Sequence, residues 1–167
     1  VADWIDYKRN IEGTDLAFSG NDATQHGIRT EDTAREVYER LTGSAVRDGS
    51  FFVQGALGAS PDGIVFGPSE APTRILEIKC PFHQLYDARK DNNKPFGIPR
   101  EYMCQMQGQM AISGARECDF FTFYAKSRSG PVLAAAFRVF FCESMWNWME
   151  PKLLTVSEWI IHGMDKD

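Results

Sequence analysis

Three charged residues in the middle of the chain, Asp62, Glu77 and Lys79, have side chains suited to binding a divalent cation and cleaving a phosphate ester. Glu77 and Lys79 lie in a run that alternates as a strand does, so both should project from one face, about 6.5–7 Å apart. Asp62 follows a Ser-Pro and precedes a short apolar run. We expect that run to pair with the Glu77 strand as a hairpin, which brings the two carboxylates together.

Two neighbouring carboxylates raise each other's pKa, and a divalent cation removes this penalty. Oxygen ligands without thiolate or imidazole select Mg²⁺ or Mn²⁺ over zinc. We therefore expect Mg²⁺ on Asp62 and Glu77, with Mn²⁺ able to substitute. Lys79 would orient or deprotonate an attacking water, or stabilise charge on a scissile phosphate. A surface salt bridge on an edge strand would explain Glu77 and Lys79 equally well from their spacing alone.

The composition is that of an ordinary globular protein, with 43% hydrophobic and 25% charged residues in a chain of 167. We expect one domain over residues 1–167. The chain begins at Val1 and not at Met, which leaves both processing and truncation of an upstream segment open. No apolar run approaches the roughly 20 residues of a membrane span. The four cysteines form no Cys-x-x-Cys pair, which favours a reduced intracellular compartment and argues against zinc. The net charge of −5 argues against tight non-specific coating of DNA.

The periodicity of apolar residues predicts helices, strands and one long loop. Expected helices are residues 3–10, 30–41 (with Thr30 as N-cap and Gly43 as the C-terminal stop), 101–112 and 142–161, the last kinked or split at Pro151. Expected strands are residues 51–53, 63–66, 74–79, 118–124 and 132–141. This order predicts an α/β (α+β) fold with a central mixed β-sheet flanked by helices.

The expected loop over residues 83–100 carries four basic residues: Arg89, Lys90, Lys94 and Arg100. They could form a rim that guides a nucleic-acid strand towards the metal. Acidic residues in the same loop dilute this charge, so a merely solvated loop is an equally good interpretation.

Several ordered motifs resemble one known superfamily. Ser60-Pro61-Asp62-Gly63, followed by Leu-Glu-Ile-Lys-Cys-Pro-Phe at residues 76–82, is similar to the PD-(D/E)XK nucleases, which have a restriction-endonuclease-like core. The closest likeness is to the phage-type recombination exonucleases, namely lambda exonuclease, YqaJ-like recombinases and viral alkaline exonucleases. Residues 27–38 resemble that family's helix with an acidic residue, and residues 102–107 resemble its helix with an active-site Gln. The likeness runs from Gly27 to Tyr124.

The resemblance implies a role for each matching residue. The implied metal ligands are Asp62, Glu77, the backbone carbonyl of Ile78 and, directly or through water, Glu31. Lys79 would assist the nucleophilic water, Gln105 would position water or the phosphate, and Ser60 would touch the substrate phosphate.

The resemblance also implies a function. It implies a 5′-to-3′ exonuclease acting on ends of double-stranded DNA in recombination, repair or viral DNA processing, with a single-strand annealing protein as partner. The cytoplasm or the nucleus of an infected host cell is the implied location. The larger relatives carry an N-terminal segment for the 5′-phosphate end, and no such segment is recognisable before Gly27. An endonuclease, an RNA-active nuclease and a catalytically silent nucleic-acid-binding module therefore stay open, as does the oligomeric state.

Overall fold

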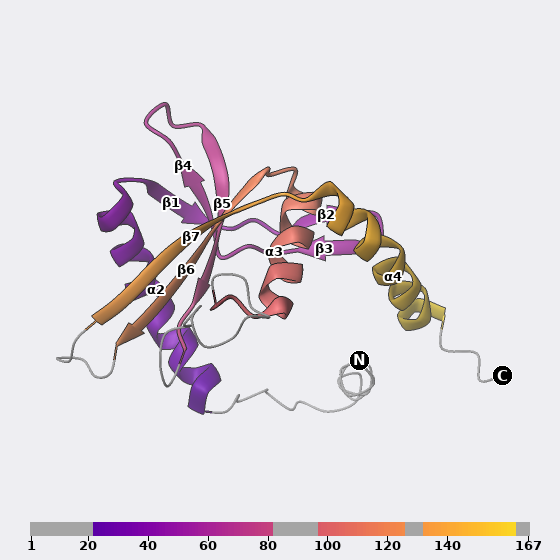
Figure 1. Ribbon diagram of the computed structural model, residues 1–167, viewed down its shortest axis with the longest axis horizontal. Helices are drawn as coiled ribbons and strands as arrows, with labels where there is room; N and C mark the ends of the chain where they lie inside the picture. Colours follow the sequence, from indigo (N-terminus) through magenta and orange to yellow (C-terminus); the bar gives the residue numbers. More distant parts are fainter. Residues whose placement is uncertain (1–21, 82–96, 126–131, 163–167) are drawn as a thin grey trace.

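The structure is a computed structural model that describes residues 22–81, 97–125 and 132–162, with residues 22–29 described as backbone only. Its centre is a five-stranded sheet in the order β1-β4-β5-β6-β7 (Figure 1). The strands of this sheet are β1 (Ala45–Asp48), β4 (Gly63–Phe66), β5 (Pro72–Lys79), β6 (Glu117–Ala125) and β7 (Val132–Phe140). Only the β5–β6 pair is parallel; the other three pairs are antiparallel. The predicted mixed sheet is confirmed.

The described residues form three helices around this sheet: α2 (Asp22–Thr42), α3 (Arg100–Ser113) and α4 (Glu143–His162). α2 covers one face of the sheet, where Ala34 and Tyr38 pack with Leu76 and Ile78. α3 covers the opposite face, where Met106 and Met110 belong to the second hydrophobic cluster of buried residues. α4 packs against α3 and extends away from the sheet (Figure 1). The helices therefore flank the sheet on both faces, as expected.

The alternation of β5 decides which side chains reach which face. Leu76 and Ile78 belong to the cluster under α2, whereas Ile75 belongs to the cluster under α3. Since side chains two apart share a face, Glu77 and Lys79 lie on the α3 side with Ile75. The period-two pattern thus buries apolar residues on one face and presents the charged pair on the other.

Some element boundaries differ from the prediction. α2 begins at Asp22, so Thr30 lies within the helix and is not its N-cap. Its end is as predicted, because Gly43 has a left-handed φ of 67° and its N–H closes the last turn on the carbonyl of Glu39 at 2.8 Å. α4 runs as one helix through Pro151, so the predicted split does not occur. The expected helix at residues 3–10 lies outside the described residues.

A small second sheet stands apart from the central one. The strand expected at residues 51–53 is β2 (Phe52–Gln54), and it pairs with β3 (Leu57–Ala59) as an antiparallel hairpin. Both strands contact α3. Strand β1, which the apolar pattern did not predict, is short and largely exposed, and it is specified by its pairing with β4.

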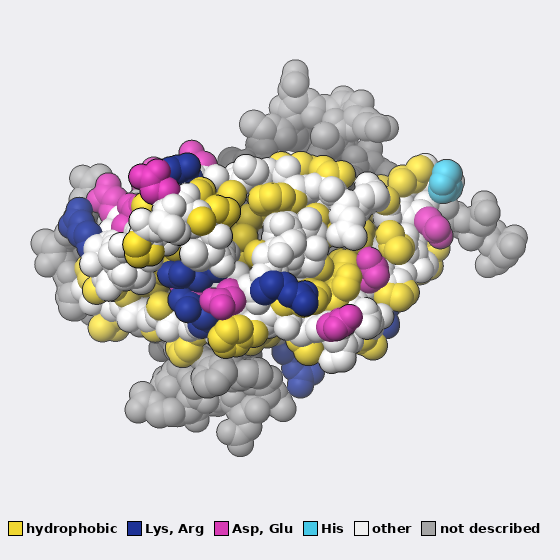
Figure 2. Space-filling model, turned by 90° about the horizontal axis from the view of Figure 1, so that it is seen from above, with side chains coloured by type: hydrophobic (Ala, Val, Ile, Leu, Met, Phe, Trp, Pro, Cys, Tyr) yellow, Lys and Arg dark blue, Asp and Glu magenta, His cyan; other side chains and the backbone are white. Residues whose placement is uncertain are grey.

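Among the described residues, no helix is long and apolar enough to cross a membrane. Large apolar side chains are nevertheless exposed along α4, and hydrophobic side chains are spread over the α4 end of the molecule in Figure 2. The exposed fraction is 60% for Trp148 and 64% for Ile161.

Candidate active site

The hairpin of β4 and β5 brings Asp62 and Glu77 together. Gly63 pairs with Leu76 in the antiparallel register, so the preceding Asp62 lies beside the following Glu77. Oδ2 of Asp62 accepts a hydrogen bond of 2.7 Å from the backbone N–H of Ile78, which fixes the carboxylate against β5. The expected juxtaposition of the two carboxylates is therefore present.

A glycine in a loop outside the motif supports the position of Asp62. A Cβ on Gly49 would lie 1.7 Å from the carbonyl oxygen of Pro61, a contact that no other residue could make without moving the backbone. The chain at Gly49 thus passes directly over the Ser-Pro-Asp turn. Because both partners are backbone, this contact restricts where the turn can place the Asp62 carboxylate.

Glu77 is fully buried, and three side chains hold its carboxylate. Oε1 accepts hydrogen bonds from the Lys79 ammonium and, at 2.7 Å, from the amide of Gln105. Oε2 accepts a hydrogen bond of 2.8 Å from the amide of Gln109. A buried carboxylate is costly unless it is paired and hydrogen-bonded, and here both oxygens are satisfied by side chains from β5 and α3.

Lys79 is held as a cation. Its Nζ contacts Glu77 and lies 5.0 Å from the centre of the Tyr102 ring, a cation–π distance. Burial alone would lower the pKa of Lys79, but the charge of Glu77 and its hydrogen bond outweigh burial and raise this pKa above its ordinary value. A charged ammonium can orient a water or stabilise a phosphate, but it cannot accept a proton. The geometry therefore favours these two roles of Lys79 over deprotonation of the attacking water.

The negative charge of Glu77 disfavours the ionised form of Asp62. Burial and then the negative charge of Glu77 raise the pKa of Asp62 to about 7, with a smaller contribution from Glu31. The Ile78 hydrogen bond and the charge of Lys79 act in the opposite direction. A cation between the carboxylates would favour the ionised form of Asp62.

Glu31 lies close enough to this pair for its charge to influence Asp62. Its side chain is 38% exposed and its nearest ionic partner is Arg35, at 3.9 Å. Because α2 starts at Asp22, Glu31 lies well beyond the first turn, and the helix dipole does not explain a carboxylate there.

Two residues that contact this site have no motif that predicts them. Arg35 of α2 donates a hydrogen bond of 3.3 Å to the backbone carbonyl of Asp62 and also forms a salt bridge with Asp48. Gln109 is a polar residue of α3 that is nevertheless only 4% exposed, and its amide contacts both Glu77 and, at 3.3 Å, the carbonyl of Ser60. Helical spacing could have indicated both residues. Arg35 follows Glu31 by four residues and Gln109 follows Gln105 by four, so each shares a helix face with a predicted site residue.

The donor atoms fit a hard divalent cation. Among the described residues, no three His, Cys, Asp or Glu side chains are grouped closely enough to hold a metal. Two carboxylates are nevertheless sufficient for Mg²⁺, which usually binds one or two of them and completes its shell with water and substrate phosphate. The buried Oε1 of Gln109 has no hydrogen-bond partner among the described atoms. This oxygen could accept a hydrogen bond from a water molecule that coordinates the cation.

The predicted DNA-contacting residues are only partly placed. Ser60 is exposed on the loop before Asp62, and Arg100 is exposed at the first position of α3. Arg89, Lys90 and Lys94 lie outside the described residues. The basic rim therefore stays a prediction.

Residues 1–116 match the YqaJ-like viral recombinase domain, a span that contains Glu31, Asp62, Glu77, Lys79 and Gln105. The chain belongs to this family. The match begins at residue 1, earlier than the resemblance recognised from Gly27. None of the curated proteins matches the sequence significantly.

Solved structures agree with this membership. The alkaline exonuclease LHK-Exo from Laribacter hongkongensis is 26% identical with a TM-score of 0.73, over 96% of this chain and 79% of that one. Its complex with dAMP gives a TM-score of 0.72, at 26% identity over 96% of this chain and 82% of that one. A phage-related exonuclease from Haemophilus somnus 129PT, 16% identical over 98% of this chain and 82% of that one, shares the fold with a TM-score of 0.70. The YqaJ-like chain is thus a nuclease of the phage-exonuclease type, which confirms the resemblance to the phage-type PD-(D/E)XK enzymes.

Proposed function

We propose that this protein is a Mg²⁺-dependent deoxyribonuclease that hydrolyses phosphodiester bonds at the ends of double-stranded DNA. The observation that carries the proposal is the pairing of Asp62 with Glu77 across β4 and β5, with Lys79 on the face of Glu77. Mn²⁺ should substitute for Mg²⁺, because both are hard cations that accept oxygen ligands.

The residues divide the chemistry between them. Asp62 and Glu77 would hold the metal with the backbone carbonyl of Ile78, and Glu31 would add a ligand directly or through water. The bound cation would supply Lewis-acid polarisation of the phosphate and of the attacking water. Lys79 would orient that water or stabilise charge on the phosphate, and Gln105, which is already bonded to Glu77, would position the water or phosphate.

Family membership and the solved relatives support the DNA-end preference. The relative of 26% identity is an exonuclease and has been observed with dAMP, a deoxynucleoside monophosphate of the kind released by stepwise cleavage of DNA. We extend this activity to the present chain, with 5′-to-3′ polarity as the expected direction. A single-strand annealing protein as partner and an intracellular location also stay predictions.

A time course on end-labelled linear duplex and on covalently closed circular DNA tests the proposal. Linear DNA labelled at its 5′ end should release mononucleotide from the outset, whereas circles should survive. Equal cutting of circles and linear DNA would contradict exonuclease action and identify an endonuclease. Preferential loss of a labelled RNA duplex in the same reactions would contradict the DNA preference.

Two lysine variants test whether the measured activity belongs to this protein or to a contaminating nuclease. Lys79→Ala should remove the activity, whereas Lys152→Ala should retain it, because Lys152 is exposed on α4 and bonds Trp148. Wild-type protein that binds duplex DNA but releases no nucleotide with Mg²⁺ or Mn²⁺ would favour a silent binding module.

A further inference from the structure

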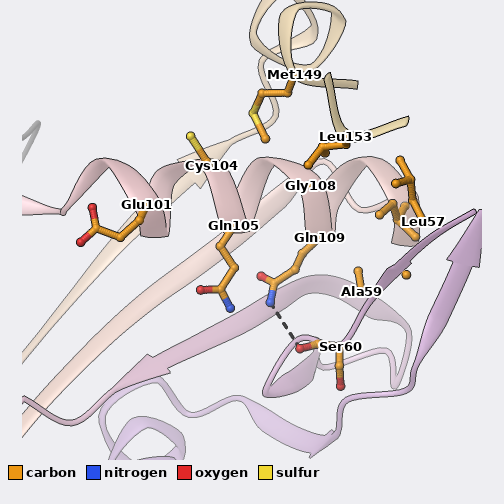
Figure 3. A pocket seen from close by; sticks show the side chains of 12 residues that line it. Leu57, Ala59, Ser60, Glu101, Cys104, Gln105, Gly108, Gln109, Met149 and Leu153 are labelled. Atoms are coloured by element: carbon orange, nitrogen blue, oxygen red, sulfur yellow. Dashed lines mark hydrogen bonds between the residues drawn. The ribbon is translucent and has the colours of Figure 1, made fainter. Parts of the chain in front are cut away.

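A cavity of about 420 Å³ lies between α3, β3 and α4, adjoining the residues that hold Glu77 (Figure 3). Ser60, Gln105 and Gln109 form its wall on the side of the carboxylates. Its volume falls within the range of about 300–1,000 Å³ that is typical of small-ligand sites. The cavity is therefore large enough for part of a substrate that reaches the proposed active site.

The walls of this cavity differ in polarity. Figure 3 shows Gln105 and Gln109 on the side of α3 that faces Ser60, with Met149 and Leu153 near the other side of the helix. Further lining comes from apolar or small residues: Leu57, Gly58, Ala59, Gly108 and Ile112. The polar edge thus lies towards the carboxylates, and the apolar part lies away from them.

The charge of the lining excludes a phosphate as the occupant of the apolar part. Glu101 is the one charged residue among the described side chains that line the cavity, and it is negative. Phosphate groups are recognised by cations and by backbone N–H groups at helix N-termini. A nucleotide bound with its phosphate near Asp62 and Glu77 would therefore place its uncharged part here.

The lining also suits a flat ring. Gly108 has no side chain, so it adds no bulk to the α3 wall of the cavity, and a Cβ there would lie 3.9 Å from the Trp146 ring, at ordinary van der Waals distance. Met149 is one of the lining residues, and its thioether sulfur can contact an aromatic ring favourably. Apolar walls beside a polar edge are what a nucleobase, with its flat faces and polar rim, requires.

We propose that this cavity binds one nucleobase of the DNA strand that is being cleaved. The proposal rests on the proposed nuclease function and adds a base-binding subsite to it. A base held there would anchor the strand beside the metal-binding carboxylates without any sequence readout, because every base has an apolar face.

Two neighbouring leucines of α4 provide the test. Leu153 lines the cavity, whereas Leu154 does not, and their exposed fractions are nearly equal at 38% and 40%. Leu153→Trp should fill the cavity, and Leu154→Trp is the matched control for a bulky ring on the same helix. Thermal unfolding of both variants establishes that each one is folded.

For wild type and both variants, the affinity for linear duplex DNA is measured with Ca²⁺ in place of Mg²⁺. Ca²⁺ should support DNA binding without cleavage. A series of duplexes carries one abasic nucleotide at successive positions from the 5′ end. Wild type and Leu154→Trp should bind one member of the series about tenfold more weakly than intact DNA, the loss expected for one unstacked base. Leu153→Trp should bind intact DNA about tenfold more weakly and lose this dependence on position.

Two outcomes would overturn the inference. If wild-type protein binds every abasic duplex as tightly as intact DNA, the cavity has another occupant, such as an apolar side chain of a protein partner. If Leu153→Trp keeps the position dependence, the base binds elsewhere. Either result leaves the nuclease proposal intact, because end-dependent cleavage is measured separately, whereas absence of both DNA binding and cleavage would refute the two together.

Discussion

The Gln109 side chain of α3 donates a 2.8 Å hydrogen bond to Oε2 of Glu77 in the middle of β5. The same amide nitrogen lies 3.3 Å from the carbonyl oxygen of Ser60, two residues before Asp62. Gln109 thus joins the two chain segments that carry the carboxylates. This makes Gln109 a positioning residue, which acts through Glu77 and the Ser60 turn.

Replacing Gln109 by Leu should weaken Mn²⁺ binding by about 10–100-fold, the usual cost of losing a group that orients a metal ligand. Calorimetric titration measures this directly. Gln107→Leu is the control, because Gln107 is equally buried in α3 but bonds the backbone of Phe140 and Cys142. The control should lower the melting temperature without changing Mn²⁺ affinity. Equal Mn²⁺ affinity in both variants would refute the positioning role.

Lys79→Ala should abolish cleavage while preserving Mn²⁺ binding. Removing the ammonium leaves Glu77 more available and the site more negative, so the affinity for a cation should stay the same or increase. Cleavage should fall because no other described cation contacts Glu77. Calorimetry that shows lost Mn²⁺ affinity in this variant would mean that Lys79 serves the metal site and not the reaction.

Glu31→Gln should reduce the rate of DNA cleavage by about tenfold or more, as expected for an added metal ligand or a group that orients its water. Its visible partner is Arg35 at 3.9 Å, a partly exposed pair whose loss should cost about 1 kcal/mol or less of stability. Glu36→Gln, which breaks a similar exposed pair with Arg40, is the matched control. If both variants lose a little stability and both cleave DNA at the wild-type rate, Glu31 contributes to stability only and not to cleavage.

A second buried carboxylate, Asp119, should make stability depend on acid pH. Oδ2 of Asp119 accepts hydrogen bonds from Tyr38 at 2.5 Å and Arg74 at 2.6 Å, and Oδ1 accepts one from Arg138 at 2.9 Å. Burial would raise the pKa of Asp119, but these three hydrogen bonds outweigh burial and hold the pKa below the ordinary 3.8. The stabilising contribution is therefore present above the unfolded pKa and is lost as pH falls through the lower folded value.

Urea unfolding of wild type and Asp119→Asn measures that contribution. At pH 7 the variant should be less stable by about 3 kcal/mol, since it leaves Arg74, whose side chain is only 13% exposed, without its charged partner. The difference should persist down to about pH 4 and then shrink as the acid form of Asp119 is populated. A difference that is as large at pH 2.5 as at pH 7 would show that shape, and not charge, is what Asp119 contributes.

The sequence predicted those parts of the site that depend on local periodicity. Glu77 and Lys79 share a face because a strand alternates, and Asp62 meets Glu77 because a hairpin sets the register. The three helices that were predicted within the described residues are present, although α2 begins earlier than expected. Its first turns are more polar than the periodic pattern that marked residues 30–41, so apolar spacing could not detect them.

The contacts between distant elements could not be predicted in this way. Gln109 is a polar helix residue of a type that is mostly exposed, and only the packing of α3 over β5 makes it a buried partner of Glu77. The close approach of Gly49 to Pro61 likewise depends on how two loops meet. β2 was predicted as a strand, but its separation into a hairpin beside α3 follows from tertiary pairing, which local propensity does not encode.

We expect Asp62 and Glu77 to hold the cation on which DNA cleavage depends. Release of nucleotide from linear duplex DNA should require added Mg²⁺ or Mn²⁺ and stop with EDTA. Asp62→Asn and Glu77→Gln should each lower the rate by about 100-fold or more and weaken Mn²⁺ binding, because each removes a charged ligand. Glu143→Gln, at the exposed start of α4, should match wild type. Undiminished cleavage in EDTA, or full activity and Mn²⁺ affinity in the Asp62 and Glu77 variants, would contradict the claim.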